Sequence, residues 1–415
     1  MAERIVLHSD LNNCYASIEC VLHPELKGKY LAVCGSTAER HGIVLAKNQL
    51  AKQCGVKTGE VIWQAKQKCP SLVVVPPDYP LYLHMSRRMH EIFGQYSDKV
   101  ESFGLDESWV EISADDMDVR KGQLVADEIR HRIHRTLGIT VSVGVADNKV
   151  MAKLGSDYKK PDATTVLLPD LYEQIVWPLP VSDLLYVGPA TTRKLARIGV
   201  CTIGQLANLD ESILAYKFGK IGYMLKAFAL GLDTSPVKPI EVSLPIKSVG
   251  NSTTPPHDIE NMTDVKELVY LLAESVATRL RENNFKARCI SVSARTTELI
   301  SSSCQTTLSQ STCLAKEIAE TALRLFEQRF RFGFPFRSMG INCSQLSPLD
   351  APVQVDMFGE DERRVKQEQL ERSIDGLRSR FGHQVIRRGI VLSDLSYSEI
   401  NPKEEHIIHP VGFLR

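Results

Sequence analysis

The chain has 415 residues, of which 43% are hydrophobic and 24% charged, a composition typical of a globular protein. A chain of this length favours roughly two to four compact units over a single core. Its 50 basic and 50 acidic side chains give a net charge of zero at pH 7, which excludes a protein that coats a polyanion through overall charge but leaves local basic patches open.

The first part of the chain predicts alternating strands and helices. The run RIVLHSD (4–10) predicts a short buried strand, and residues 81–96 predict a helix with one apolar stripe. Two strands are then expected to fold back near Gly104–Asp106, and a helix over 124–137 to end at Gly138. With the further strands ITVSVGVA and TTVLLP, this order is that of a split βαβ unit.

An insertion and a helical unit flank this pattern. Residues 12–77 form an insertion after the first strand, in which Val44–Cys54 predicts a helix that Gly55 ends. Residues 169–232 predict a helical unit with two short helices around a turn at Ile198–Gly199–Val200. A Pro-containing stretch, 231–245, predicts a linker.

The chain then repeats the split βαβ order. The expected elements are a strand near 243–250, a helix over 264–283, strands over 289–296 and 305–309, a helix over 313–330 and a strand over 338–344. Residues 347–364 predict an exposed linker, and 365–382 predict one amphipathic helix. This last helix belongs to an extension that we expect to pack on the unit before it.

Adjacent carboxylates occur in SFGLDESWVE (102–111). In a regular strand Asp106 and Glu107 point to opposite faces, but at a bend they converge, and Asp10 joins them if the first strand pairs with this hairpin. Convergent carboxylates need cations such as Mg²⁺, and two such ions roughly 3.5–4 Å apart can activate an attacking oxygen and stabilise a leaving pyrophosphate. The residues alone leave open a solvated turn at Asp106–Glu107 and a helix cap at Asp10.

Four motifs of the chain resemble those of the Y-family translesion DNA polymerases, and the bacterial DNA polymerase IV group in particular. The motifs are HSDLNNCYASIE (8–19), GLDESWVE (104–111), TVSVGVADNKVMAKLGSDYKKPD (140–162) and VGPATTRKLARIGV (187–200). They occur in the family's order, and the resemblance runs from the first residue to about residue 345.

The resemblance implies an α+β fold of the right-hand polymerase kind. It has a ferredoxin-like palm, small fingers, a helical helix-hairpin-helix thumb and a βαββαβ little finger. By position, these are residues 1–11 and 78–168 (palm), 12–77 (fingers), 169–232 (thumb), 233–242 (linker), 243–345 (little finger) and 346–415 (clamp-binding linker and C-terminal extension).

The resemblance also implies an enzyme, a DNA-directed DNA polymerase that extends a primer and bypasses lesions with low fidelity in DNA repair. Asp10, Asp106 and Glu107 are the implied catalytic carboxylates. With the Leu11 backbone carbonyl they are also the implied ligands of two Mg²⁺ ions, for which Mn²⁺ can substitute. In two-metal nucleotidyl transfer the primer 3′-hydroxyl attacks the α-phosphate of a deoxynucleoside triphosphate, and pyrophosphate leaves.

The implied nucleotide-binding residues are Asn13, Cys14, Tyr15, Ala46, Gln49, Lys52 and Lys160. Tyr15 is the implied steric gate, whose ring fills the space that a ribose 2′-hydroxyl needs, and Lys160 neutralises triphosphate charge. The family commonly has a hydroxyl residue, Tyr and Arg where this chain has Ala46, Gln49 and Lys52. We therefore expect weak triphosphate binding. Cys14 also leaves a smaller wall beneath the sugar than the aromatic residue common in this group.

Primer-template DNA is the partner that the remaining basic residues are expected to hold. Gly188 opens a helix whose N-terminal amides can meet a phosphate, and the strands of the last unit carry basic residues among Ser and Thr. The predicted DNA-binding residues are Gly188, Thr191, Arg193, Lys194, Lys247, Arg288, Arg295 and Arg337. A helical packing turn and an ordinary solvated sheet face are the alternatives.

A peptide in the late linker resembles the sliding-clamp-binding peptide of bacterial polymerases. It is QVDMF (354–358), in which Gln354, Asp356, Met357 and Phe358 are the implied contacts. Binding to a clamp adds processive attachment by tethering. We expect a monomer, and no proofreading exonuclease unit is evident in the chain.

Two other functions fit part of this pattern. A nucleotide cyclase on the same palm also uses paired carboxylates and two metals, but it needs no grip on duplex DNA. A catalytically weak DNA-binding or scaffolding relative fits the altered residues Ala46, Gln49 and Lys52. Primer extension with Mg²⁺ separates these alternatives from an active polymerase.

The cysteines and the first residues of the chain bear on where in the cell the protein is located. Ten cysteines occur at irregular spacing without a C-x-x-C pair, which argues against a zinc site and a thioredoxin-like motif. The start, MAERIVLHSDLNN, turns polar too early for a signal peptide, and no stretch approaches the roughly 18 apolar residues of a membrane span. We expect free thiols, no membrane contact and a cytoplasmic location.

Overall fold

The computed structural model describes residues 4–36, 42–112, 118–242, 245–351 and 360–392. They fall into two compact units, one within Met1–Gly35 and Ile43–Ser243 and the other within Leu244–Ile407. Each unit has its own sheet and its own apolar core. Among the described helices, none is both long and apolar enough to pass through a membrane.

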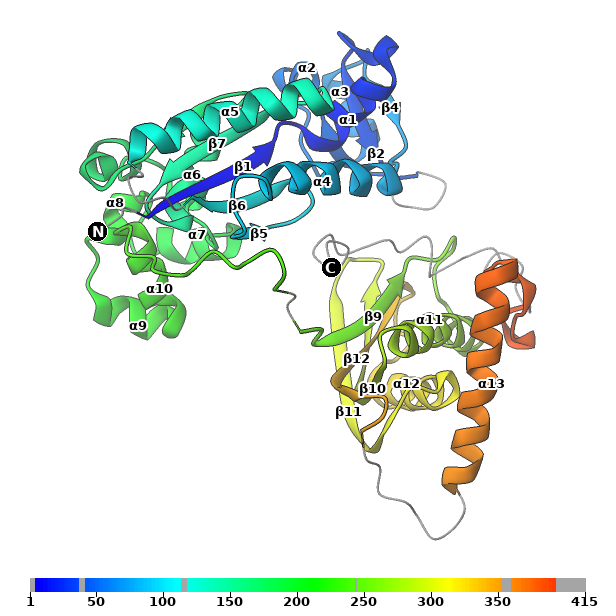
Figure 1. The fold of residues 1–415 in the computed structure, drawn as a ribbon. Coiled ribbons are helices and arrows are strands. Elements are labelled where there is room, and N and C mark those ends of the chain that lie inside the picture. The colour runs from blue at the N-terminus through cyan, green and yellow to red at the C-terminus, as the bar shows by residue number, and fades with distance from the viewer. Residues whose placement is uncertain (1–3, 37–41, 113–117, 243–244, 352–359, 393–415) are drawn as a thin grey trace. The chain divides into compact units, whose positions relative to one another are not determined.

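A five-stranded sheet with the order β5-β6-β1-β7-β8 lies at the centre of the first unit (Figure 1). β1 (Ile5–Leu11) pairs antiparallel with β6 (Glu107–Ile112) and with β7 (Val141–Ala146). β5 (Val100–Ser102) forms a hairpin with β6, and β8 (Thr164–Val166) runs parallel to β7. The structure confirms the predicted strands and the predicted hairpin.

Helices cover both faces of this sheet. α4 (Tyr79–Phe93) and α5 (Val119–Leu137) pack on one face, and α6 (Lys149–Tyr158) packs on the other. The sequence pattern predicts α4 and α5 but does not indicate α6. A Cβ at Gly144 of β7 would lie 1.8 Å from the carbonyl oxygen of Ala152, so glycine is required where α6 approaches the strand this closely.

Residues 12–77 form a small layer of their own beside the sheet. It contains α1 (Cys14–Leu22), a three-stranded sheet of β2 (Leu31–Cys34), β3 (Val44–Lys47) and β4 (Val73–Val75), and the short helices α2 (Gln49–Gln53) and α3 (Ile62–Lys68). The strand order is β3-β2-β4. Part of its buried residues form a separate small core, while others, such as Ile18 and Leu31, pack into the main core of the unit.

The helix predicted over Val44–Cys54 is wrong in its first half. β3 occupies this half because it pairs antiparallel with β2, with Ala46 opposite Val33. The side-chain oxygen of Asn48 then accepts a hydrogen bond from the backbone N–H of Ala51 at 3.0 Å, so the helix begins only after this cap. Ala46 therefore lies on a strand and not on a helix.

Residues 169–232 are mainly helical, as predicted. The helices are α7 (Pro189–Ala196), α8 (Ile203–Ala207), α9 (Glu211–Phe218) and α10 (Lys220–Ala229). The predicted turn between α7 and α8 contains Gly199 at φ 80°, a left-handed conformation that favours glycine. Thr202 and Gln205 form a capping box that starts α8.

The second unit has the predicted βαββαβ order. Its elements are β9 (Ser248–Thr253), α11 (Met262–Glu282), β10 (Phe285–Thr296), β11 (Ser301–Thr312), α12 (Ala315–Arg329) and β12 (Phe336–Pro348). The antiparallel sheet has the order β11-β10-β12-β9, and α11 and α12 cover the same face of it (Figure 1). The apolar core lies between this face and the two helices.

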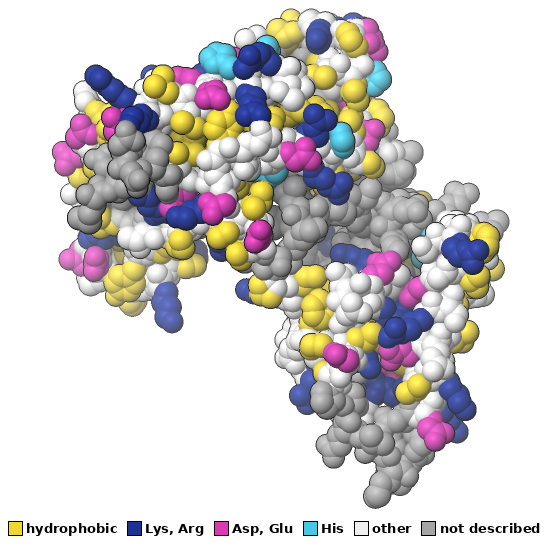
Figure 2. Space-filling model, viewed as in Figure 1, with side chains coloured by type: hydrophobic (Ala, Val, Ile, Leu, Met, Phe, Trp, Pro, Cys, Tyr) yellow, Lys and Arg dark blue, Asp and Glu magenta, His cyan; other side chains and the backbone are white. Residues whose placement is uncertain are grey.

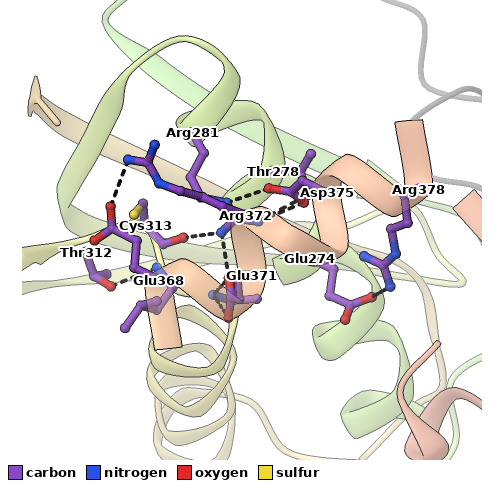
Figure 3. A network of polar contacts seen from close by, with 12 residues as sticks. Glu274, Thr278, Arg281, Thr312, Cys313, Glu368, Glu371, Arg372, Asp375 and Arg378 are labelled. Carbon is purple, nitrogen blue, oxygen red and sulfur yellow. Dashed lines mark hydrogen bonds and ion pairs between the residues drawn. The ribbon is translucent and has the colours of Figure 1, made fainter. Parts of the chain in front are cut away.

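A further helix, α13 (Glu360–Phe381), is anchored to this unit by a buried ionic network (Figure 3). Arg281 of α11 donates to Glu371 at 2.5 Å and to Asp375 at 2.7 Å, and all three lie largely out of solvent. Glu371 also accepts from the backbone N–H of Ala315 at 3.0 Å, where α12 begins. The predicted extension therefore packs on α11 and on the start of α12.

Candidate active site

The three candidate carboxylates converge where the β5–β6 hairpin meets the end of β1. Asp10 stands directly opposite Glu107 in the antiparallel register of β1 and β6. The backbone N–H of Leu11 donates to the carbonyl oxygen of Asp106 at 3.0 Å, which ties the bend to β1. The structure therefore brings Asp10, Leu11, Asp106 and Glu107 together, because the bend allows neighbouring side chains to meet.

Two lysines hold two of these carboxylates. Lys160 Nζ lies 2.6 Å from Asp10 Oδ2 and 2.7 Å from Asp157 Oδ1. Lys153 of α6 donates to Glu107. Sequence reasoning found Lys160 but not Lys153, and the signal that could have found Lys153 is its i,i+4 spacing to Asp157 on a helix that had not been expected.

Burial and mutual repulsion raise the pKa values of Asp10 and Asp106, whereas contacts with His8 and Lys153 lower the pKa of Glu107. Burial raises the pKa of Asp10 to about 7, and the charges of Glu107 and Asp106 add to the rise against the opposing Lys160. Burial and the charge of Glu107 raise the pKa of Asp106 to about 6. Burial acts to raise the pKa of Glu107 as well, but its contacts with His8 and Lys153 hold it at about 2.

His8 is a second residue that sequence reasoning missed. Its ring is fully buried, with Nδ1 2.8 Å from the hydroxyl of Ser156 and Nε2 3.4 Å from Glu107 Oε2. Burial lowers the pKa of His8 to about 4, so the ring is neutral at pH 7. Lys153 is therefore the cation that keeps Glu107 ionised.

The donor set fits hard divalent cations. Carboxylate and backbone carbonyl oxygens are the ligands that Mg²⁺ prefers. Burial and the neighbouring carboxylates raise the pKa values of Asp10 and Asp106, so added positive charge at this place favours their ionised forms. Within the described residues, no group of three or more His, Cys, Asp or Glu side chains is already arranged as a metal site. Lys160 and Lys153 explain this, because each draws one carboxylate toward itself.

Tyr15 lies close to the carboxylates, at the start of α1. Its ring stacks on Tyr82 with centroids 4.3 Å apart and meets the edge of Tyr79 at 5.9 Å. Burial raises the pKa of Tyr15, and the charge of Asp106 adds to the rise. Two other rings thus hold the ring of the candidate gate in place.

The two residues before Tyr15 start α1 beside the same carboxylates. Asn13 is the N-cap of α1 and has a left-handed backbone, with φ 52°. Cys14 is buried, and burial together with the charges of Asp106 and Asp10 raises the pKa of its thiol well above the usual value. Cys14 is therefore a neutral part of the wall near the carboxylates.

Asn12 secures the loop that carries Lys160. Its side-chain oxygen accepts hydrogen bonds from the Thr140 hydroxyl at 3.0 Å and from the backbone N–H of Asp162 at 2.8 Å. Its amide nitrogen donates to the Ser142 hydroxyl at 2.9 Å. An amide can donate and accept here where a carboxylate can only accept, so Asn12 is matched to its partners.

Comparison with known proteins identifies the family. The model described as "impB/mucB/samB family" matches residues 9–157, and its C-terminal domain matches residues 246–357. DNA polymerase IV of Acetivibrio thermocellus is 47% identical over 96% of this chain and 100% of that protein. DNA polymerase IV 1 of Bacillus subtilis is 35% identical over 94% of this chain and 93% of that protein.

The chain belongs to the DNA polymerase IV group of the Y-family DNA polymerases. It is a DNA-directed DNA polymerase of the translesion kind. Two solved structures support the fold: a Y-family DNA polymerase chimera of Dbh and Dpo4 has a TM-score of 0.73 at 24% identity, covering 82% of this chain and 99% of that one. DinB from Sulfolobus solfataricus has a TM-score of 0.54 at 24% identity, covering 82% and 98%.

The residues that the resemblance predicts to contact the triphosphate from this segment lie on two different elements. Ala46 is on β3 and packs partly buried against the main core, while Gln49 and Lys52 are on α2. Lys52 is exposed and Gln49 is half-buried. The side chain of Ala46 carries no hydrogen-bonding group, so of these three predicted residues Gln49 and Lys52 have side chains that can donate to a phosphate.

The predicted helix-hairpin-helix segment includes α7. Gly188 is the N-cap of this helix, and Thr191 lies in its first turn with exposed Arg193 and Lys194 after it. Tyr186, two residues before the N-cap, has φ 68°, a left-handed conformation that a glycine adopts at less cost.

The sheet face of the second unit that lies away from α11 and α12 carries small polar side chains in register. Paired positions across β9, β12, β10 and β11 give the rows Ser252, Gly340, Ser293 and Ser303, then Gly250, Asn342, Ser291 and Gln305. A Cβ at Gly340 would lie 2.8 Å from the Cβ of Ser252, so the rows are tightly packed. Such a face offers many hydroxyls and few bulky groups.

The predicted basic residues are spaced along this sheet and do not meet at one point. Lys247 precedes β9, Arg288 and Arg295 are exposed on β10, and Arg337 is half-buried on β12. Arg295 stands opposite Ser338 and Ser301, in line with the polar rows. On the face drawn in Figure 2, Lys and Arg side chains of the described residues lie among Asp and Glu side chains. The predicted clamp residues Gln354, Asp356, Met357 and Phe358 lie outside the described residues.

Proposed function

We propose that this polymerase extends primers by two-metal nucleotidyl transfer at Asp10, Asp106 and Glu107. The observation that carries the proposal is the meeting of these carboxylates at the β5–β6 bend, opposite the end of β1. These carboxylates and the Leu11 carbonyl would hold two Mg²⁺ ions, which would supply positive charge for activation of the primer 3′-hydroxyl and stabilisation of the leaving pyrophosphate. Primer extension on undamaged and lesion-bearing templates with Mg²⁺ tests the proposal, with Asp106→Ala as the decisive variant.

Lys160 and Lys153 have different tasks in this proposal. Lys160 contacts Asp10 from the loop that Asn12 holds. Its ammonium group would leave this ion pair and pair with the phosphates of an incoming triphosphate. Lys153 stays on Glu107, under the ring of Phe103 at 5.5 Å from its centroid. A triphosphate carries several negative charges, so exchange of Lys160 from one carboxylate to the phosphates is favourable.

Tyr15 acts as the steric gate against ribonucleotides. We expect Tyr15→Ala to raise the kcat/KM for ribonucleotides relative to deoxynucleotides by at least about tenfold, because nothing else then fills the space of the 2′-hydroxyl. Tyr15→Phe keeps the ring that stacks on Tyr82 and should keep the wild-type ratio within about twofold. Unchanged discrimination in Tyr15→Ala would assign the gate to another residue. Single-nucleotide incorporation with matched dATP and ATP measures both ratios.

Lys52 limits the affinity for the triphosphate. We expect a KM for the correct deoxynucleotide above the low-micromolar range, and Lys52→Arg to lower it by about three- to tenfold, because the planar guanidinium binds phosphate in a bidentate manner. Lys57→Arg, on the exposed surface beyond the same helix, is the matched control and should leave KM unchanged. A low-micromolar wild-type KM that Lys52→Arg does not alter would contradict this interpretation.

The grip on primer-template DNA is divided between the two units. The N-terminus of α7 with Arg193 and Lys194 is suited to one backbone phosphate region, and the polar sheet face with Lys247, Arg288, Arg295 and Arg337 to another. Hydroxyls and isolated basic residues contact phosphates without reading bases. Such contacts suit a polymerase that copies many sequences and damaged templates.

The remaining proposals concern the sliding clamp, the oligomeric state and the cellular location. The QVDMF peptide would tether the polymerase to a sliding clamp through Gln354, Asp356, Met357 and Phe358, on the strength of its sequence and its position after the second unit. The enzyme would act as a monomer in the bacterial cytoplasm. Its relationship to bacterial DNA polymerase IV proteins supports that location.

A further inference from the structure

A polar cluster joins α4 to both strands of the hairpin that carries the candidate carboxylates. His90 of α4 places Nε2 2.8 Å from the hydroxyl of Ser102 on β5 and 2.9 Å from the hydroxyl of Ser108 on β6. Ser102 and Ser108 are themselves a register pair of the hairpin. One side chain of the helix therefore bridges the two strands just before and just after their bend.

The hydrogen-bond partners of the His90 ring indicate which of its nitrogens carries the proton. Its Nδ1 lies 2.7 Å from the carbonyl oxygen of Ser86, which can only accept, so Nδ1 carries the proton. Burial lowers the pKa of His90, so the ring is neutral and Nε2 is an acceptor. The hydroxyl of Ser102 then donates to Nε2, while that of Ser108 is also 2.8 Å from the carbonyl oxygen of Glu107.

A second bond from α4 reaches the bend itself. The hydroxyl of Ser86, one helical turn before His90, donates to the carbonyl oxygen of Leu105 at 2.6 Å. On the other side of the bend, Leu11 of β1 donates to the carbonyl oxygen of Asp106. The residues between β5 and β6 are thus fixed from α4 and from β1 at successive carbonyls.

We propose that His90 is a positioning residue for polymerisation, which fixes the β5–β6 hairpin on α4 so that Asp106 and Glu107 are aimed at the reacting atoms. The inference rests on the proposed role of these two carboxylates. His90 does not touch them, and it acts through Ser102, Ser108 and the backbone of the hairpin. Because misplacement of a reacting group by about 1 Å can cost roughly a hundredfold in rate, such a bridge has a direct effect on kcat.

The choice of residues at these places also favours positioning over simple packing. Apolar side chains at all three positions could fill the same space without the cost of burying hydroxyls and an imidazole. A hydrogen bond of fixed length and direction holds a hairpin at one distance from the helix, whereas apolar contacts allow it to slide. Each partner in the cluster is satisfied, as a positioning network requires.

The test compares His90→Leu with a triple variant that carries His90→Leu, Ser102→Ala and Ser108→Ala. His90→Leu leaves the half-buried Ser102 hydroxyl without its acceptor and takes the imidazole away from the buried Ser108 hydroxyl, which keeps the Glu107 carbonyl oxygen as an acceptor. Both Tm and kcat should therefore fall, kcat by about ten- to a hundredfold with the KM for nucleotide within about twofold. The triple variant also removes these two hydroxyls and should regain wild-type Tm. It should nevertheless keep the low kcat, because the bridge is still missing.

Mn²⁺ affinity gives a readout that does not depend on turnover. With primer-template DNA and a non-hydrolysable nucleotide, the triple variant should bind Mn²⁺ at least about threefold more weakly, as measured from the electron paramagnetic resonance signal of the free ion. His84→Leu, on an exposed position of the same helix, is the matched control and should behave as wild type. Wild-type kcat and Mn²⁺ affinity in the triple variant would overturn the proposal. Full activity of Asp106→Ala, measured in parallel, would instead overturn the site on which it rests.

Discussion

Asp106→Ala abolishes primer extension, with a fall in kcat of at least about a thousandfold, while the affinity for primer-template DNA stays within about threefold of wild type. The physical reason is the loss of one of the carboxylates that converge at the β5–β6 bend. In the proposed mechanism, charge that develops on the attacking and leaving oxygens is stabilised by cations that these carboxylates would hold. The DNA-binding residues proposed above lie on other elements, so binding is retained.

A companion variant separates chemistry from folding. Asp106→Asn keeps the shape of the side chain and removes one of the charges that raise the pKa of Asp10. Relief of this repulsion should raise Tm by a few degrees while kcat stays as low as in Asp106→Ala. Glu91→Ala removes an exposed carboxylate of α4 and should leave both kcat and Tm unchanged. Extension by Asp106→Asn near the wild-type rate would contradict the proposed role.

The elements that could be predicted from sequence are those with local signals. The strand 4–10, the hairpin near Gly104–Asp106 and the helix end at Gly138 follow from alternation, from a bend at glycine and from a left-handed cap. The βαββαβ order of the second unit follows from the same periodicities. Each of these features is decided within a few residues, so the chain itself contains the information.

The predictions from sequence fail where contacts between residues far apart in the chain determine the local structure. Val44–Lys47 resembles the start of a helix, but pairing with β2 makes it a strand, and only the Asn48 cap then allows α2 to begin. The three carboxylates and Lys160 could be proposed from sequence, but Lys153 could not. Lys153 and His8 meet Glu107 only through the register of β1 with β6 and the packing of α6 against β7.

The ionic anchor of α13 is the other place where a single substitution should have a large effect. Arg281, Glu371 and Asp375 have little solvent around them, and Arg281 also donates to the carbonyl oxygen of Cys313 at 2.7 Å (Figure 3). Burial raises the pKa of Glu371, and the bonds from Ala315 and Arg281 oppose that rise. The guanidinium of Arg281 therefore pairs with both carboxylates, and Arg388 Nη2 lies 3.6 Å from Glu371 Oε1 as a second, more distant cation.

Arg281→Met should lower the free energy of unfolding of the second unit by about 3–5 kcal/mol, because it removes the guanidinium that pairs with both Glu371 and Asp375 in a largely buried site. The three tryptophans of the chain, Trp63, Trp109 and Trp177, all lie in the first unit. Their fluorescence therefore follows that unit alone, while far-UV circular dichroism follows both. We expect the urea transition seen by circular dichroism to split, with the fluorescence transition unchanged.

Replacing the whole triad distinguishes a lost ion pair from lost packing. A triple variant with Arg281→Met, Glu371→Leu and Asp375→Leu removes every buried charge of the triad and should recover most of the stability that Arg281→Met loses. Arg372→Met on the exposed side of α13, where the side chain pairs with Glu368 at 3.1 Å, should change the stability by less than about 0.5 kcal/mol. If Arg281→Met lowered the free energy of unfolding as little as Arg372→Met, apolar contacts would hold α13. The ionic network would then orient the helix without adding to its stability.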